Sequence, residues 1–151
     1  MRTIINESVY LKKGYKVDTN KALLNLDYIF NFLTQDSYWG KALPRKNFET
    51  SIQESICFGV YFDNKQIGFA KVISDKSTFA YLADVFIDKN YRGLGLSKLL
   101  LQTVFNHPQL IGIRRFLLAT ADAHQLYKKF GFVELSNPNW FLEKMKSYDE
   151  S

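Results

Sequence analysis

The sequence predicts a mixed α/β (α+β) fold, with a mostly antiparallel sheet and helices on both of its faces. Three observations support this: three successive strand-like segments, amphipathic helical segments before and after them, and a strand–glycine–helix segment at residues 85–101. With 151 residues, 46% of them hydrophobic, the chain has the length and the core of one domain, so we expect a single domain over residues 1–151.

Composition narrows the class of protein. The one cysteine, Cys57, excludes an internal disulfide and suits a reducing compartment. No apolar run reaches membrane-spanning length and the N-terminus lacks the apolar stretch of a signal peptide, so we expect a cytoplasmic protein with no membrane partner. The net charge of +5 is compatible with a polyanionic partner, but the basic residues are scattered, so no nucleic-acid partner is expected.

The N-terminal third is expected to form a strand and two helices. The strand is placed at residues 9–17. Asp18, Thr19 or Asn20 could cap the first helix, and Pro44 suits the first turn of the second. The first helix is indicated by an apolar stripe: Leu23, Leu26, Ile29, Phe30 and Leu33.

The middle of the chain predicts a hairpin and a third strand. The hairpin strands are placed at residues 58–62 and 66–74, around a turn at residues 63–65. A third strand over 78–87 leads into a helix over 96–106, which ends before a proline.

The C-terminal part is expected to continue with a strand at residues 113–119 and a helix at residues 123–130. Gly131 suits the left-handed residue that ends a helix. Two short strands, at residues 132–135 and 140–143, are expected to complete the sheet.

The segment at residues 85–101 has the pattern of an anion site. Glycines allow the backbone to approach a ligand, and the first amides of a helix have no intrahelical partner and carry partial positive charge. Arg92 and Lys98 add two cations. The spacing fits neither a dinucleotide fingerprint, whose third glycine would replace Lys98, nor a nucleoside triphosphate loop. A glycine turn without a ligand is the alternative interpretation of this segment alone.

The segment Arg92-Gly93-Leu94-Gly95-Leu96-Ser97 resembles the pyrophosphate loop of the GCN5-related N-acetyltransferases (GNAT), whose pattern is Gln/Arg-x-x-Gly-x-Gly/Ala. Ser97 departs from it by a hydroxyl. A second resemblance lies at residues 120–132, which are similar to the family's Asn-x-x-Ala-x-x-Leu-Tyr-x-x-x-Gly-Phe. The matching residues are Ala123, Leu126, Tyr127, Gly131 and Phe132, while Thr120 replaces the common Asn.

The resemblance implies that acetyl-CoA binds between two parallel strands that splay apart, expected at residues 78–87 and 113–119. No metal is expected. Backbone groups left unpaired by the splaying would bind the pantetheine arm in the manner of an added strand. The cofactor-binding residues implied are Val85, Phe86, Ile87, Arg92, Gly93, Leu94, Gly95, Leu96, Ser97, Lys98 and Thr120.

The resemblance also implies two residues for the chemistry. Tyr127 would protonate the coenzyme A thiolate as it leaves, and the alternative is a core tyrosine. Asp84 interrupts an apolar strand, and alternation places it on one face with Leu82 and Phe86. Asp84 could attract a cationic amine and take its proton, or it could be a structural carboxylate paired with a cation.

The acceptor side is assigned to Tyr38, Trp39 and His124. In the family the two N-terminal helices and their connecting loop cover the acceptor, so Tyr38 and Trp39 could form an aromatic wall, or could simply close the core. His124 shares a helix face with Tyr127 and could instead be a surface residue.

The expected function is acetyl transfer from acetyl-CoA to a primary amine of a small molecule, amino acid or peptide, by direct attack through a tetrahedral intermediate. The alternatives are an acyltransferase that uses a longer acyl-CoA and a non-catalytic acyl-CoA sensor. The protein would be a monomer or a homodimer.

Overall fold

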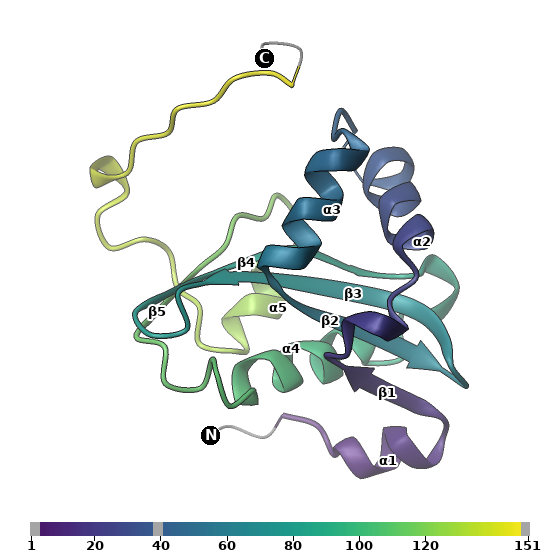
Figure 1. The fold of residues 1–151 in the computed structure, drawn as a ribbon. Coiled ribbons are helices and arrows are strands. Elements are labelled where there is room, and N and C mark those ends of the chain that lie inside the picture. The colour runs from purple at the N-terminus through teal and green to yellow at the C-terminus, as the bar shows by residue number, and fades with distance from the viewer. Residues whose placement is uncertain (1–3, 38–40, 149–151) are drawn as a thin grey trace.

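A five-stranded sheet forms the centre of the molecule in the computed structural model, which describes residues 4–37 and 41–148. The strands lie in the order β1-β2-β3-β4-β5. They are β1 Tyr15–Asp18, β2 Ile56–Phe62, β3 Lys65–Ser74, β4 Phe79–Ile87 and β5 Arg115–Leu117. Neighbours pair antiparallel except β4 and β5, which are parallel, so the sheet is mixed as predicted (Figure 1).

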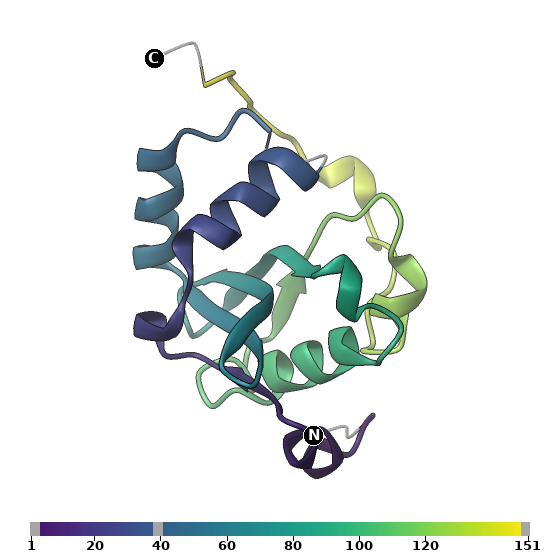
Figure 2. The ribbon, with the colours of Figure 1, turned by 90° about the vertical axis from the view of Figure 1, so that its right-hand side faces the viewer.

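Helices cover both faces of this sheet, which confirms the predicted layers. The α-helices are α1 Glu7–Lys12, α2 Leu26–Asn31, α3 Arg45–Glu54, α4 Leu96–Asn106 and α5 His124–Lys128. Shorter turns are η1 Lys21–Leu23, η2 Phe32–Asp36, η3 Lys89–Tyr91 and η4 Pro138–Trp140, of which η2 is a π-helix and the others are 3-10 helices. Figures 1 and 2 show α2 and α3 on one face and α4 and α5 on the other. None of the helices in the described residues is long and apolar enough to cross a membrane.

The sheet separates two apolar clusters. Leu100, Leu101 and Val104 of α4 pack beneath it with inward side chains of β2, β3 and β4. Ile29 of α2 and Phe48 of α3 pack on the opposite face. Each cluster buries the apolar stripe of a helix that the sequence pattern identified.

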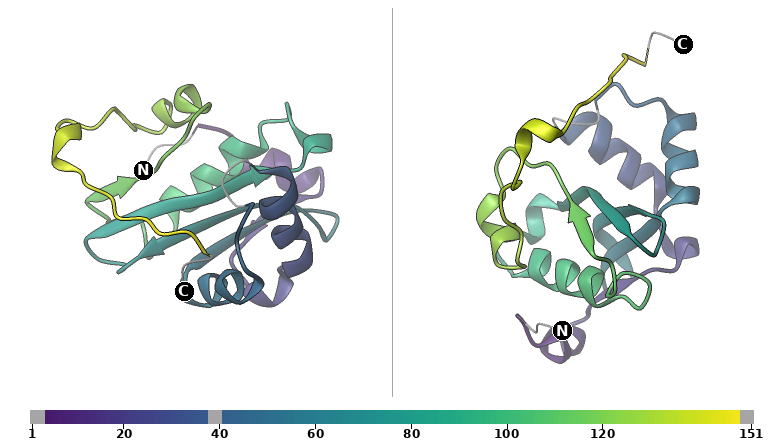
Figure 3. Two further views of the ribbon diagram at one scale, coloured as in Figure 1. Left: turned by 90° about the horizontal axis from the view of Figure 1, so that it is seen from above. Right: turned by 90° about the vertical axis from the view of Figure 1, so that its left-hand side faces the viewer.

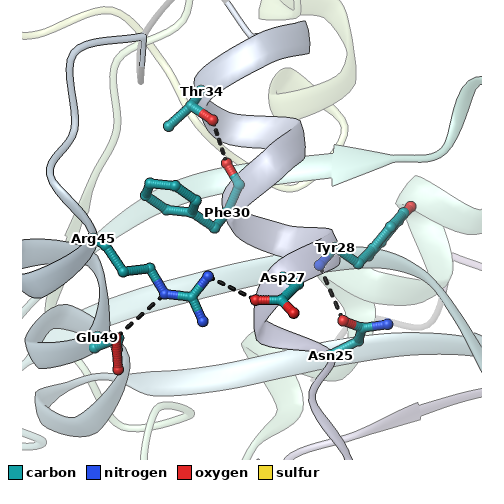
Figure 4. Close-up of polar contacts among 7 residues, drawn as sticks. All are labelled: Asn25, Asp27, Tyr28, Phe30, Thr34, Arg45 and Glu49. Atoms are coloured by element: carbon teal, nitrogen blue, oxygen red, sulfur yellow. Dashed lines mark hydrogen bonds and ion pairs between the residues drawn. The ribbon is translucent and has the colours of Figure 1, made fainter.

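Arg45 ties α2 to α3 on the outer surface of the second cluster. Its guanidinium donates to Asp27 at 2.7 Å and to Glu49 at 3.3 Å (Figure 4). The same group lies over the rings of Phe30 and Phe48, at 5.2 and 5.7 Å from their centroids. Of these contacts, those with Asp27 and Phe30 join α3 to α2, and the ion pair to Asp27 is an exposed one that contributes little stability.

The predicted strand at residues 9–17 is wrong over its first half. The Asn6 side chain accepts from the Ser8 amide at 3.1 Å and caps helix α1. Gly14 then takes a positive φ of 95°, and β1 begins only after it. A side-chain cap at one residue thus overrides the strand-like composition of the segment.

The first predicted helix is divided. Asn20, one of the three expected caps, caps only the short turn η1, and Asn25 caps α2 by accepting from the Tyr28 amide at 3.0 Å (Figure 4). Thr34 bonds back to the Phe30 carbonyl at 2.8 Å within the irregular turn that follows. Pro44 is the cap of α3, as expected for the start of the second helix.

The two final strands, at residues 132–135 and 140–143, are absent from the described part of the chain. Neither segment forms a strand in the described residues. The neighbouring strand β5 forms three residue pairs, and all of them are with β4. The strand expected at 113–119 is likewise reduced to Arg115–Leu117. The hairpin and the helix at 96–106 are confirmed.

Candidate active site

The parallel strands β4 and β5 part after a short pairing. Phe79, Ala80 and Tyr81 pair with Arg115, Phe116 and Leu117, and no later residue of β4 has a β5 partner among the residues described. The segment from Leu82 to Ile87 therefore keeps one edge of its backbone available. This is the splayed pair that the family resemblance implies, with Val85, Phe86 and Ile87 beyond the point where the strands part.

A β-bulge lies within this open segment. The pairing of β3 with β4 shifts register between Phe69 and Lys71, and Asp84 has a positive φ of 55°. The bulge corrects the predicted alternation. Leu82 packs in the α4 cluster and Phe86 in the cluster of α2 and α3, so they do not share a face.

Asp84 is half-buried at the bulge and forms an ion pair. The Lys71 ammonium lies 2.9 Å from its Oδ2, and the side chains of Lys71 and Asp84 are only 10% and 15% exposed. Lys71 also contacts the Ser51 hydroxyl of α3 at 3.3 Å. The carboxylate thus lies on the side of the sheet that α3 covers. Its pairing with Lys71 agrees with the interpretation of Asp84 as a structural carboxylate paired with a cation. The role of Asp84 as a proton acceptor stays a prediction.

The glycine loop follows β4 and opens helix α4. Gly93 and Gly95 have φ values of 79° and 82°, in the left-handed region that glycine favours. Gly95 is the N-cap of α4, and no side chain in the described residues caps this helix end. The amides of Leu96, Ser97 and Lys98 therefore point outward without an intrahelical acceptor, as an anion site requires.

The side chains of this loop have different environments. Leu96 is buried in the core, so only its backbone can meet a ligand. Leu94 is exposed, while Ser97 and Lys98 are half-buried in the first turn of α4. Of the predicted loop residues, Ser97 and Lys98 are those that combine a polar side chain with a free helix-end amide.

Two side chains hold the loop in place. The Arg92 guanidinium Nε donates to the Ile87 carbonyl at 3.1 Å, which ties the loop to the end of β4. The Tyr10 hydroxyl of α1 donates to the Leu94 carbonyl at 2.8 Å, and a Cβ added to Gly95 would collide with it. Sequence reasoning missed Tyr10, because it lies 84 residues from Leu94 and no local pattern links them.

Tyr28 is a second residue that the sequence analysis missed. Its hydroxyl donates to Asp88 Oδ2 at 3.1 Å, just after β4, and its ring lies 5.8 Å from that of Phe86. Burial, together with the carboxylates of Asp88 and Asp36, raises the pKa of Tyr28 above its ordinary value. The hydroxyl therefore stays protonated at neutral pH, so it can donate its proton to the Asp88 carboxylate near the open end of β4.

Tyr127, Thr120 and His124 lie together beside β5. Tyr127 is buried in the α4 cluster, where Val85 and Ile87 also pack. The Thr120 hydroxyl accepts from the Ala123 amide at 3.1 Å and so fixes the turn before α5. His124 is exposed, and all three residues line one open hollow.

Two predicted residues, Tyr38 and Trp39, lie outside the described residues. Within residues 4–37 and 41–148, no group of three or more His, Cys, Asp or Glu side chains could hold a metal ion. The structure therefore brings together the loop, β4 and Asp84, places Tyr127 in the same core cluster, and leaves the acceptor wall a prediction.

Comparison with known proteins identifies the family. The family model of the GNAT acetyltransferase domain matches residues 53–134. The chain belongs to the GNAT acetyltransferase family. A Gibberella zeae protein assigned by its name to the acetyltransferases is 30% identical, over 85% of this chain and 84% of that protein.

Solved GNAT structures share the architecture. A Xanthomonas campestris protein described as a GNAT acetyltransferase is 44% identical, with a TM-score of 0.85 over 88% of this chain and 94% of that one. A Clostridium acetobutylicum acetyltransferase solved with acetyl-CoA has a TM-score of 0.61 over 87% of this chain and 94% of that one, at 19% identity. The latter similarity concerns the fold alone.

Proposed function

We propose that this GNAT protein transfers the acetyl group of acetyl-CoA to a primary amine of a small molecule, amino acid or peptide. The observation that carries the proposal is the position of the glycine loop. It begins just beyond the segment of β4 that has separated from β5, so a strand edge and a row of helix-end amides adjoin. An extended amide-bearing chain that ends in a pyrophosphate matches both features.

The residues present fit such a ligand. Gly93 takes a positive φ, and an added Cβ there would meet no protein atom within 4 Å, so the space beside the loop is open. Val85, Phe86 and Ile87 would bind the pantetheine arm, although the Ile87 carbonyl already accepts from Arg92. Ser97 and Lys98 would bind the pyrophosphate, and Thr120 would lie near the cofactor arm.

The chemistry supplied by acetyl-CoA is an activated thioester. In the proposed reaction the amine nitrogen attacks its carbonyl carbon, a tetrahedral intermediate forms, and the carbon–sulfur bond then breaks. Tyr127 would give its hydroxyl proton to the departing thiolate, and Asp84, directly or through water, would accept the proton lost by the amine. Tyr38, Trp39 and His124 are proposed to line the acceptor site.

A screen of amines, amino acids and peptides with acetyl-CoA, followed by thiol release, tests this proposal. Acetylated product and stoichiometric thiol are expected for at least one amine class. Binding of acetyl-CoA without turnover of any amine would instead support the sensor alternative, and faster turnover of longer acyl-CoA would support the acyltransferase alternative. The cytoplasmic location stays a prediction from the sequence.

A further inference from the structure

Asp88 organises the turn between β4 and the glycine loop. Its amide donates to the Ile67 carbonyl at 2.7 Å, which fixes the residue to β3. Its carboxylate Oδ1 accepts from the Asn90 amide at 3.0 Å, and its carbonyl oxygen accepts from the Tyr91 amide at 2.9 Å. These bonds form the 3-10 turn η3, which leads directly into Arg92 and the glycines. The position of Asp88 therefore determines where the glycine loop begins.

The second carboxylate oxygen of Asp88 accepts a bond from the helical layer above the sheet. The Tyr28 hydroxyl of α2 donates to Oδ2 at 3.1 Å. The Tyr28 ring lies 5.8 Å from that of Phe86, and Phe32, one turn further along the chain, stacks on Phe86 at 3.8 Å with an interplanar angle of 7°. Figures 1 and 3 show α2 and the turn after β4 at the same end of the sheet. Helix α2 is thus joined to the end of β4 by one hydrogen bond and two ring contacts.

The hydrogen bond is the polar part of this connection. Among the ion pairs of the described residues none involves Asp88, so Tyr28 is the side chain that bonds its Oδ2 there. Bonds from a hydroxyl to a carboxylate are stronger and more directional than bonds between neutral groups. The ring contacts hold α2 against β4, and the hydroxyl fixes its position relative to η3.

Helix α2 leads into the segment that is proposed to cover the acceptor. It continues from Phe32 as the π-helix η2, a rare conformation that is often found at functional sites. The buried Ser37 follows η2 and donates to the Leu33 carbonyl at 2.6 Å. The next residues in the sequence are Tyr38 and Trp39, the predicted acceptor wall. A shift of α2 relative to β4 would therefore displace the residue from which this wall departs.

We propose that Tyr28 is a positioning residue that couples the acceptor-covering helix α2 to the glycine loop through Asp88. A ligand on the loop holds η3 and Asp88 in one arrangement, and the Tyr28 bond passes this restraint to α2. The amine then meets a surface that is already ordered, so less ordering entropy opposes its binding. By linkage, the amine strengthens the binding of the loop ligand by the same factor. The identity of both ligands rests on the proposed function.

Hydrogen exchange on the full chain, with and without acetyl-CoA, tests this coupling without knowledge of the amine. In the wild type, acetyl-CoA is expected to slow exchange at residues 89–98 and, roughly fivefold, at residues 26–36. Tyr28→Phe keeps the ring contacts and removes the hydroxyl, so residues 89–98 should still be protected while the protection of residues 26–36 is lost. Tyr61→Phe is the matched control and should behave as the wild type. It removes a buried hydroxyl that has no hydrogen-bond partner among the described residues.

Steady-state kinetics with an amine found by the acetyl-CoA screen gives a second measurement. Tyr28→Phe is expected to raise the KM for the amine roughly fivefold and to leave kcat nearly unchanged, because Tyr28 positions the acceptor surface and does not touch the reacting atoms. Equal protection of residues 26–36 in Tyr28→Phe and the wild type would overturn the proposal, as would the same loss of protection in Tyr61→Phe. A wild type that binds acetyl-CoA in calorimetry without protecting residues 26–36 would overturn this proposal alone. A wild type that binds no acetyl-CoA would overturn the proposed function as well.

Discussion

Replacing Asp84 by Asn tests whether the buried ion pair is structural, catalytic or both. Asn keeps the volume of the side chain and tolerates the positive φ of 55°, so the bulge should persist. The variant leaves the Lys71 ammonium, 10% exposed, without the anion now 2.9 Å away. Breaking a buried pair by removing one partner costs about 3–5 kcal/mol. At roughly 2–4 °C per kcal/mol for a chain of this length, Tm should fall by about 10 °C.

The second arm of this experiment is the pair Lys71→Met and Lys71→Met/Asp84→Asn. Methionine removes the charge and keeps the length of the side chain, so the double variant should recover most of the stability lost by Asp84→Asn, as measured by thermal and urea unfolding. If Asp84 also receives the proton of a cationic amine, the double variant stays inactive although it is stable. In Asp84→Asn the loss of kcat/KM should then be greatest near neutral pH and should shrink as the pH approaches an amine pKa of about 10.

Two results would refute this reasoning. An Asp84→Asn variant with unchanged unfolding free energy would show that the ion pair contributes nothing. A double variant with normal kinetics would show that the carboxylate is not needed for turnover, and the base would then be water or another group.

Four further predictions concern the loop and the core. Gly93→Glu should abolish acetyl-CoA binding in calorimetry while circular dichroism stays unchanged, and Gly112→Glu, which adds the same charge in open space outside the loop, should not. Tyr127→Phe should lower kcat on the order of 100-fold with little change in acetyl-CoA affinity, and unchanged turnover at every pH would make it structural. Tyr10→Phe should raise the Kd for acetyl-CoA several-fold without changing the kcat of the saturated enzyme, because the loop loses its bond from α1. Burial raises the pKa of Cys57 to about 11, so a thiol reagent at pH 8 should react with it only after unfolding, and stability should decline as pH rises from about 9 towards 11.

The apolar periodicity of the chain was sufficient to predict the hairpin and helix α4. Whether a segment forms such a strand or helix depends on the spacing of apolar residues within a few positions, and the sequence displays that spacing directly. The bulge at Asp84 was not predictable in this way, because a one-residue register shift leaves the composition of the strand unchanged. The prediction therefore placed Leu82 and Phe86 on one face, whereas they lie on opposite faces.

Contacts between segments that are distant in the chain could not be predicted from the sequence either. The Lys71–Asp84 pair and the bond from Tyr28 to Asp88 each join separate elements, and neither partner carries a local signal of the other. The two C-terminal strands failed for a related reason. An apolar segment becomes a strand only where a partner edge meets it, and among the described residues neither of these segments pairs with β5.

The N-terminal segment explains how a glycine loop can be held rigid. The Gln102 amide of α4 accepts from the Ile4 and Ile5 backbone amides at 2.6 and 3.0 Å, and donates to the Glu7 carboxylate at 3.1 Å. Glycines give the loop close approach and positive φ, but they also leave it many alternative conformations. Anchoring α1 through Gln102 allows the Tyr10 hydroxyl to fix the loop from outside, while Arg92 fixes it from β4. A loop restrained on both sides presents its amides in one arrangement before a ligand arrives, so less ordering entropy opposes binding.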